Sequence, residues 1–144
     1  MGKAMFNKAL VPVNSSDLSA RVAAKAAELV ERGFVESVVL FSVWEADEID
    51  YSKLFSADKE AELKAAAQAV LEQYKSRFIE ASIAAQTVRV GGDPADLIIN
   101  AVEKGDYDLI IMGSRKLNKA RELLFGSVSD RVTRLVSVPI LLIK

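Results

Sequence analysis

Short apolar segments alternate with longer amphipathic ones along the chain. The apolar segments, which predict strands, cover residues 8–13, 37–43, 86–90, 108–112 and 138–143. Apolar residues at helical spacing predict helices over about 17–32, 56–80 and 94–104, and a fourth from about residue 127. A run such as Val38-Val39-Leu40-Phe41, apolar on both faces, is typical of a strand buried in a parallel sheet. The alternation therefore predicts an α/β fold, with helices on both faces of a parallel sheet and right-handed crossovers.

The ends of the predicted helices carry local signals. Gly33 follows the first helical segment, where a left-handed cap residue is expected. Asp93 precedes the third segment and Pro94 takes its first position, and both residue types are favoured at a helix start. The long segment 56–80 has one apolar stripe, which predicts a core-facing surface made of Leu63, Ala67, Val70, Tyr74 and Phe78.

The carboxyl ends of the strands are the expected place for a ligand. In open α/β sheets, ligands bind beyond these ends at the point where the strand order reverses. With the strands in the order 3-2-1-4-5, numbered along the chain, the reversal would fall between the first and fourth strands, whose ends are Asn14 and Gly113. The pattern of apolar residues alone leaves this order open.

Composition narrows the classes of function. The 144 residues suit a single domain, 1–144, and 51% of them are hydrophobic. Since the chain has neither cysteine nor histidine, thiolate chemistry, Ser-His and Cys-His pairs and most zinc sites are excluded. A net charge of −1 argues against a nucleic-acid partner, which would require a basic stripe. We find neither an apolar run long enough for a membrane helix nor a signal-peptide core, and therefore expect a cytoplasmic protein.

Four carboxylates gather in the loop after the second strand: Glu45, Asp47, Glu48 and Asp50. Such a cluster raises the alternative of a metal site. The glycine and the spacing of a calcium-binding loop are missing, however, so a solvated loop is the favoured interpretation and we expect no resident metal.

The most informative segment follows the fourth strand. Two glycine-containing corners, Gly113-Ser114-Arg115-Lys116 and Gly126-Ser127-Val128-Ser129, are separated by nine residues and end at a helix start. Unpaired N–H groups and the helix dipole favour phosphate at such a start, and glycine lets the main chain approach it closely. The spacing is thus compatible with a phosphate-binding loop. The alternative is a turn glycine at Gly113 and a simple N-cap at Ser127.

An ordered set of motifs makes the chain resemble the universal stress protein family. The matching segments are ALVPVNSS at 9–16, GDPAD at 92–96, DLIIMGSR at 108–115, GSVSDRV at 126–132 and VPILLI at 138–143. The resemblance implies a three-layer Rossmann-like fold of the adenine nucleotide alpha hydrolase type, with five parallel strands in the order 3-2-1-4-5 and four helices. It also implies a homodimer. We expect its interface along the last strand, between Val138 and Ile143, because this apolar strand would lie at the edge of the sheet.

One branch of that family binds ATP through Gly-x2-Gly-x9-Gly-Ser/Thr, and another branch lacks the motif. Carried over to this chain, the resemblance implies ATP or another adenine nucleotide, accompanied by Mg2+, bound by Pro12, Val13, Asn14, Val43, Met112, Gly113, Arg115, Lys116, Gly126, Ser127, Val128 and Ser129. Two positions depart from the family pattern. Lys116 replaces the second glycine, and a positive φ there would strain lysine by roughly 1 kcal/mol or more. Asn14 replaces an aspartate and brings a hydrogen-bonding amide without charge.

These observations leave three classes of function. The favoured one is a nucleotide-binding regulatory or stress-response module without catalytic residues, in which ATP hydrolysis is slow at most because the motif contains no evident general base. The second is a dimeric interaction protein of the same fold that binds no nucleotide. The third is an α/β enzyme acting on another phosphorylated ligand, such as an electron-transfer flavoprotein or an adenylate-forming enzyme.

Overall fold

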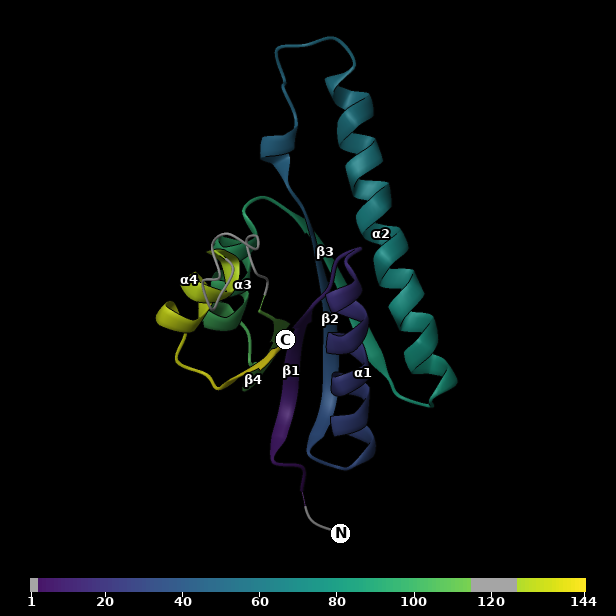
Figure 1. The fold of residues 1–144 in the computed structure, drawn as a ribbon, viewed down its shortest axis with the longest axis vertical. Helices are drawn as coiled ribbons and strands as arrows, with labels where there is room; N and C mark the ends of the chain where they lie inside the picture. Colours follow the sequence, from purple (N-terminus) through teal and green to yellow (C-terminus); the bar gives the residue numbers. More distant parts are fainter. Residues whose placement is uncertain (1–2, 115–126) are drawn as a thin grey trace.

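A computed structural model describes residues 3–114 and 127–144 of the chain. Strands and helices alternate along it as the sequence predicts (Figure 1). The elements are β1 (Phe6–Pro12), α1 (Asp17–Glu31), β2 (Val35–Trp44), the 3-10 helix η1 (Ala46–Glu48), α2 (Ser56–Glu80), β3 (Ala85–Gly91), α3 (Pro94–Lys104), β4 (Leu109–Gly113), α4 (Ser127–Leu135) and β5 (Ile140–Ile143). Within the described ranges, no helix combines the length and the apolar character needed to cross a bilayer.

The strands form one parallel sheet in the order β3-β2-β1-β4-β5. This confirms the order that the family resemblance implied. β1 pairs with β2 along its whole length, up to Pro12 opposite Phe41, whereas its pairing with β4 covers Ala9 and Leu10. β1 and β4 therefore separate toward their carboxyl ends, at the point where the strand order reverses.

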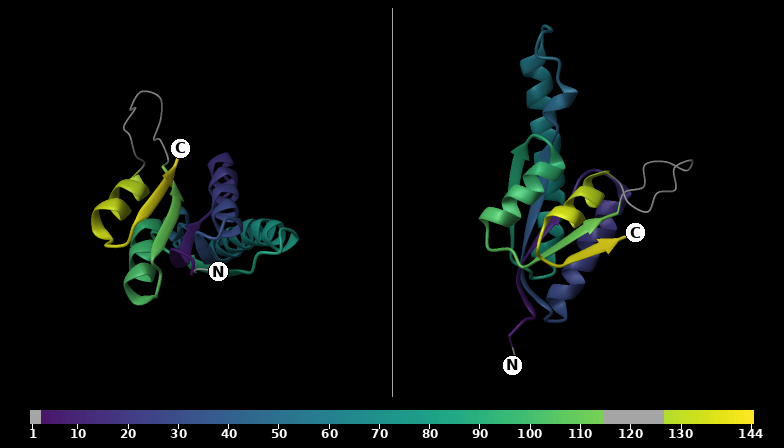
Figure 2. Two further views of the ribbon diagram at one scale, coloured as in Figure 1. Left: turned by 90° about the horizontal axis from the view of Figure 1, so that it is seen from below. Right: turned by 90° about the vertical axis from the view of Figure 1, so that its left-hand side faces the viewer.

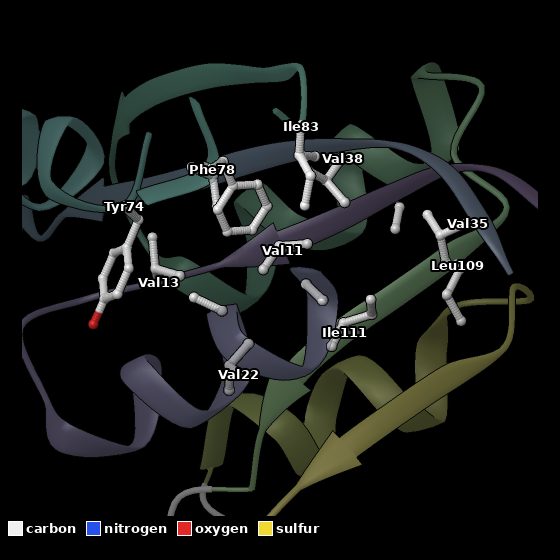
Figure 3. Close-up of a cluster of buried hydrophobic side chains, with 14 of the residues drawn as sticks. Val11, Val13, Val22, Val35, Val38, Tyr74, Phe78, Ile83, Leu109 and Ile111 are labelled. Carbon is white, nitrogen blue, oxygen red and sulfur yellow. The ribbon is translucent and has the colours of Figure 1, made fainter. Parts of the chain in front are cut away.

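Helices cover both faces of the sheet. α1 and α2 lie on one face and α3 and α4 on the other, with the strands between them (Figure 2). Val11 and Phe78 belong to the buried cluster of the first face, which Figure 3 shows in close-up. Leu10 and Ile98 belong to the cluster of the second face. Neighbouring residues of β1 thus point into opposite cores, which explains why the strands are apolar on both sides.

The carboxyl end of α1 closes with the cap that the sequence predicts. Gly33 has a φ of +82°, and its N–H donates to the carbonyl of Val30 at 3.0 Å. The N–H of Phe34 donates to the carbonyl of Leu29 at 2.9 Å. This pair of bonds is the Schellman motif, in which glycine adopts the left-handed conformation without the strain that a side chain would add.

The long helix α2 has the bounds that the sequence predicts, and its apolar stripe is confirmed in the carboxyl-terminal part. The buried side chains of α2 are Ala67, Leu71, Tyr74 and Phe78. Leu63 and Val70, expected in the same stripe, are half-buried. The amino-terminal part of α2 extends past the end of the sheet (Figure 1).

Two segments depart most from the sequence-based expectation, and the bounds of the other strands differ from it by one or two residues. The segment after β2 was expected to be loop, but Ala46–Glu48 forms the short helix η1. The last strand is also shorter than expected, since β5 begins at Ile140 and not at Val138. Pro139 lacks an N–H group for the ladder, although its carbonyl accepts a hydrogen bond from the N–H of Ile110 at 3.0 Å.

Candidate functional site

A cavity of about 330 Å³ opens where the carboxyl ends of β1 and β4 separate. Its walls come from both faces of the sheet. α1 contributes Leu18 and Val22, α3 contributes Pro94 and Ile98, and the first turn of α4 contributes Val128. The cavity therefore lies where the topology of an open α/β sheet predicts a ligand.

Most of the residues predicted to bind nucleotide line this one cavity. They are Pro12, Val13, Asn14, Val43, Met112, Gly113, Val128 and Ser129. Ser127 is the first residue of α4, but its side chain lies outside the described residues, as do Arg115, Lys116 and Gly126. The carboxyl ends of β1, β2 and β4 and the start of α4 thus converge at one place. The binding role of their residues stays a prediction.

The turn between β1 and α1 is held together by the side chain of Asn14. Its Oδ1 accepts hydrogen bonds from the N–H of Ser16 at 2.9 Å, the hydroxyl of Ser16 at 2.6 Å and the hydroxyl of Ser19 at 2.9 Å. The buried Ser19 hydroxyl accepts in turn from the N–H of Asn14 at 2.8 Å. The side-chain carbonyl of Asn14 is therefore engaged by the protein itself. Its Nδ2 group has no hydrogen-bond partner among the described residues.

Gly113, the last residue of β4, lets α1 approach the sheet closely. A Cβ atom built on it would lie 2.5 Å from Cδ2 of Leu18 and 2.8 Å from its Cγ. Leu18 belongs to the first turn of α1 and also lines the cavity. The glycine thus has a packing role at the end of a strand. The sequence alone predicts a phosphate contact or a turn at this position, and not this packing role.

An ion-pair bridge fixes α4 against the start of α3. Asp93 caps α3 as predicted, since its Oδ2 accepts from the N–H of Asp96 at 2.9 Å, and Pro94 follows it. The guanidinium of Arg131 on α4 lies 3.5 Å from Asp93 and 2.5 Å from Asp96. Beside it, Val132 is fully buried in the core. These contacts hold the first turn of α4, the positive end of its dipole, at the cavity.

Several lining residues were not predicted from the sequence: Ser16, Leu18, Ser19, Val22, Phe41, Glu45, Pro94 and Ile98. A local signal existed for the two serines, because hydroxyls that follow an asparagine at a strand end often close an Asx-type turn. The apolar members had no such signal, since a helix residue at a core position looks the same whether it faces a cavity or the core. Glu45 was assigned to a solvated loop.

The other carboxylates after β2 are exposed, and one of them, Asp50, stabilises the local turn. Asp50 accepts hydrogen bonds from the hydroxyl of Ser52 at 2.5 Å and from its N–H at 3.0 Å. Chiefly the first of these bonds, with help from the second, lowers the pKa of the Asp50 carboxyl group. Over the described ranges, we find no group of three or more acidic side chains arranged to hold a metal ion.

The lining combines chemistry of two kinds. Apolar side chains such as Phe41, Ile98 and Met112 form most of the wall, which suits a flat or hydrophobic ligand group. Polar groups line the cavity at the Asn14 turn, at Glu45 and at the first turn of α4. The arrangement can therefore hold an amphiphilic small molecule whose anionic part lies at the helix start.

The chain is similar over its whole length to known universal stress proteins. A model of the Universal stress protein family matches residues 5–144. Universal stress protein YxiE of Bacillus subtilis is 31% identical over 97% of this chain and 100% of its own length. The solved structure of MJ0577 from Methanocaldococcus jannaschii has a TM-score of 0.84 at 27% identity, covering 98% of this chain and 97% of that one.

Two other solved structures of this fold contain a nucleotide. A universal stress protein family protein of Arabidopsis thaliana has AMP bound, with a TM-score of 0.72, 22% identity, and coverage of 96% of this chain and 91% of that one. Another universal stress protein, in complex with cAMP, has a TM-score of 0.70, 18% identity, and coverage of 96% and 97%. At these identities the likeness shows the fold alone. The family model and YxiE show more: this chain belongs to the universal stress protein family.

Proposed function

We propose that this universal stress protein binds an adenine nucleotide in the cavity between β1 and β4 and acts as a nucleotide-dependent regulatory or stress-response module. The observation that carries the proposal is the convergence of β1, β2, β4 and α4 on one cavity at the reversal of strand order. The AMP and cAMP complexes of proteins with this fold support the choice of an adenine nucleotide.

The lining supports a defined orientation for the nucleotide. Phe41, Val43 and Met112 offer apolar surface for a base. Val128 and Ser129 belong to the first turn of α4, where the N–H groups and the helix dipole favour phosphate. We therefore place the nucleoside toward the ends of β1 and β2 and the phosphates toward α4.

Binding, and not turnover, is the proposed activity. The whole chain lacks histidine and cysteine, so the commonest general base and the commonest thiol nucleophile are absent. Any ATP hydrolysis is then slow. Mg2+ would enter with the phosphates of ATP, because the protein offers no separate cluster of acidic ligands in its described part.

Calorimetric titration with ATP, ADP and AMP tests the proposal, together with a pair of matched variants. Val43 lines the cavity, and Val90 lies opposite it on β3 without lining the cavity. We expect saturable binding of at least one nucleotide, weakened about tenfold or more by Val43→Phe and unchanged by Val90→Phe. If no nucleotide at millimolar concentration produces saturable heat, the proposal fails and a module without nucleotide takes its place.

We also propose a homodimer formed through β5. This strand lies at one edge of the sheet, and its residue Leu141 is 37% exposed. An apolar groove of about 340 Å³ lies beside it. An exposed apolar edge is normally paired or covered, and two copies related by a two-fold axis would pair these edges antiparallel. Light scattering at tens of micromolar protein should give twice the chain mass, and a monomer mass would contradict the proposal.

A further inference from the structure

The end of β2 brings a carboxylate to the cavity. Glu45 follows Trp44, the last residue of β2, and its half-buried side chain lines the wall. Among the described lining residues, Glu45 alone has a side chain that carries a charge. Its neighbours in the sequence, Asp47 and Glu48, are exposed and do not line the cavity. Glu45 is therefore distinguished from the rest of the acidic loop by its position.

The Asn14 side chain cannot supply the acceptor that a ligand would need there. Its Oδ1 already accepts three hydrogen bonds, two from Ser16 and one from Ser19. What remains is the Nδ2 group, which only donates. A ligand with hydroxyl groups must therefore find its acceptor elsewhere on the wall, and a carboxylate accepts such bonds most strongly.

The position of Glu45 indicates which part of a nucleotide it meets. In the dinucleotide-binding members of the doubly wound folds, an acidic residue about 20 residues after the first βα turn accepts a hydrogen bond from the 2′-hydroxyl of the ribose. The two oxygens of one carboxylate can accept from both hydroxyls of a vicinal diol. The phosphates then lie at the first turn of α4, the positive end of its dipole.

We propose that Glu45 binds the ribose diol and makes the site selective for ribonucleotides over nucleotides that lack these hydroxyls. The inference rests on the proposed nucleotide-binding function and adds a specificity-determining residue to it. Asn14 then orients the turn through its carbonyl and donates from Nδ2 to an acceptor on the ligand.

The test compares AMP with 2′,3′-dideoxyadenosine monophosphate in calorimetric titrations. The natural protein should prefer AMP by roughly tenfold to a hundredfold, the scale of hydrogen bonds to a charged group. Glu45→Gln keeps the size of the side chain and removes its charge, so the preference should fall about tenfold. Asp47→Asn, in the same loop but outside the lining, should leave the preference unchanged. Glu45→Asp, which keeps the charge on a shorter side chain, should give an intermediate preference.

The possible failures are distinguishable. If the natural protein binds both nucleotides equally, or if Glu45→Gln binds AMP with the full preference intact, the ribose role is overturned while nucleotide binding stands. If the natural protein binds neither nucleotide, the proposed function itself fails and the ribose role with it. Circular dichroism of each variant confirms that the compared proteins are folded.

Discussion

The two ends of the sheet each carry a hollow, and the two hollows differ in chemistry and not in size. The cavity at the carboxyl ends measures about 330 Å³ and the groove at the amino ends about 340 Å³. The lining of the first includes polar groups at the Asn14 turn, at Glu45 and at α4. The second is lined by apolar side chains: Phe6, Leu29, Phe34, Val35, Leu109, Ile140 and Leu141. The volumes therefore do not distinguish the two hollows, whereas the lining of the first suits an amphiphilic small molecule and the lining of the second suits an apolar surface of a protein.

The difference follows from the direction of the chain. At the carboxyl ends, strands lead into helix starts, which need polar caps such as Asn14 and Asp93. At the amino ends, helices finish and strands begin. There the Schellman motif of α1 joins Phe34 to Leu29 by a backbone hydrogen bond, and both residues line the groove. Apolar residues are favoured at these two positions of the motif. Apolar residues at the groove thus have a structural reason independent of any partner.

The largest effect is expected from Gly113→Val at the carboxyl end. The added side chain meets Leu18, because even a Cβ would lie 2.5 Å from its Cδ2. Leu18 must then move into the cavity or force α1 outward. We expect a loss of about 1–3 kcal/mol of stability, as for other overpacked sites, and a loss of nucleotide affinity of about tenfold or more. Urea unfolding and calorimetry measure the two effects, and native-like values for both would contradict the close packing of Leu18.

Leu141→Lys changes the amino-end groove without touching the cavity. Leu141 is 37% exposed, so we expect the stability of the monomer to change by less than about 1 kcal/mol. A charge in the apolar interface should raise the dimer dissociation constant about tenfold or more. Sedimentation of the natural protein and of the Leu141→Lys variant across a concentration series measures this dissociation constant. If the variant associates as strongly as the natural protein, β5 does not form the interface. As a control, the nucleotide affinity of the variant should equal that of the natural protein.

Ser19→Ala tests the internal bonding of the Asn14 turn. The buried hydroxyl exchanges two hydrogen bonds with Asn14, so its loss leaves the backbone N–H of Asn14 without this partner. We expect a cost of about 1–2 kcal/mol in chemical unfolding. Ser16→Ala is the matched control, since Ser16 is exposed and water can replace its hydroxyl. An equal loss of stability in Ser19→Ala and Ser16→Ala would contradict the greater importance of the buried hydroxyl.

Local signals in the sequence predicted much of this architecture, and non-local contacts supplied the rest. Gly33 and Asp93 were predicted correctly because each cap depends on its own neighbours along the chain. The packing role of Gly113 depends on Leu18, which precedes it by most of the chain length. Whether Glu45 faces water or the cavity depends likewise on the fold, since a carboxylate after a strand looks the same in both cases. The order of the strands came from the family resemblance and not from periodicity.

The smallest expected effect is the pH dependence of the stability that an ion pair contributes at the amino ends of the strands. Lys8 Nζ lies 2.8 Å from Asp106 Oδ1. This hydrogen bond is the main cause that lowers the pKa of Asp106 and raises that of Lys8. The stabilisation by Asp106 is present above its unfolded pKa, near 3.8, and is lost as pH falls through the lowered folded pKa. The stabilisation by Lys8 is present below 10.5 and is lost as pH rises through the raised folded pKa.

The contribution of the Lys8–Asp106 pair to the free energy of unfolding should therefore be constant between about pH 5 and pH 9. It should also be small, because both groups are exposed. Thermal unfolding of the natural protein and of the Asp106→Asn variant, at a series of pH values, measures this contribution. The difference in midpoint should be slight and flat across this range and should vanish in strong acid. A difference that grows between pH 5 and pH 9 would indicate another titrating group.

Titration of ¹⁵N-labelled protein with AMP, followed by the amide resonances, tests most directly the claim that the two hollows have different roles. At a chain length of 144 residues, both ends of the sheet can be followed in one spectrum. We expect saturable shifts at Val13, Val43 and Val128 around the cavity and none at Phe34 and Leu141 in the groove. Shifts centred on Phe34 and Leu141, or no saturable shift at either end, would contradict it.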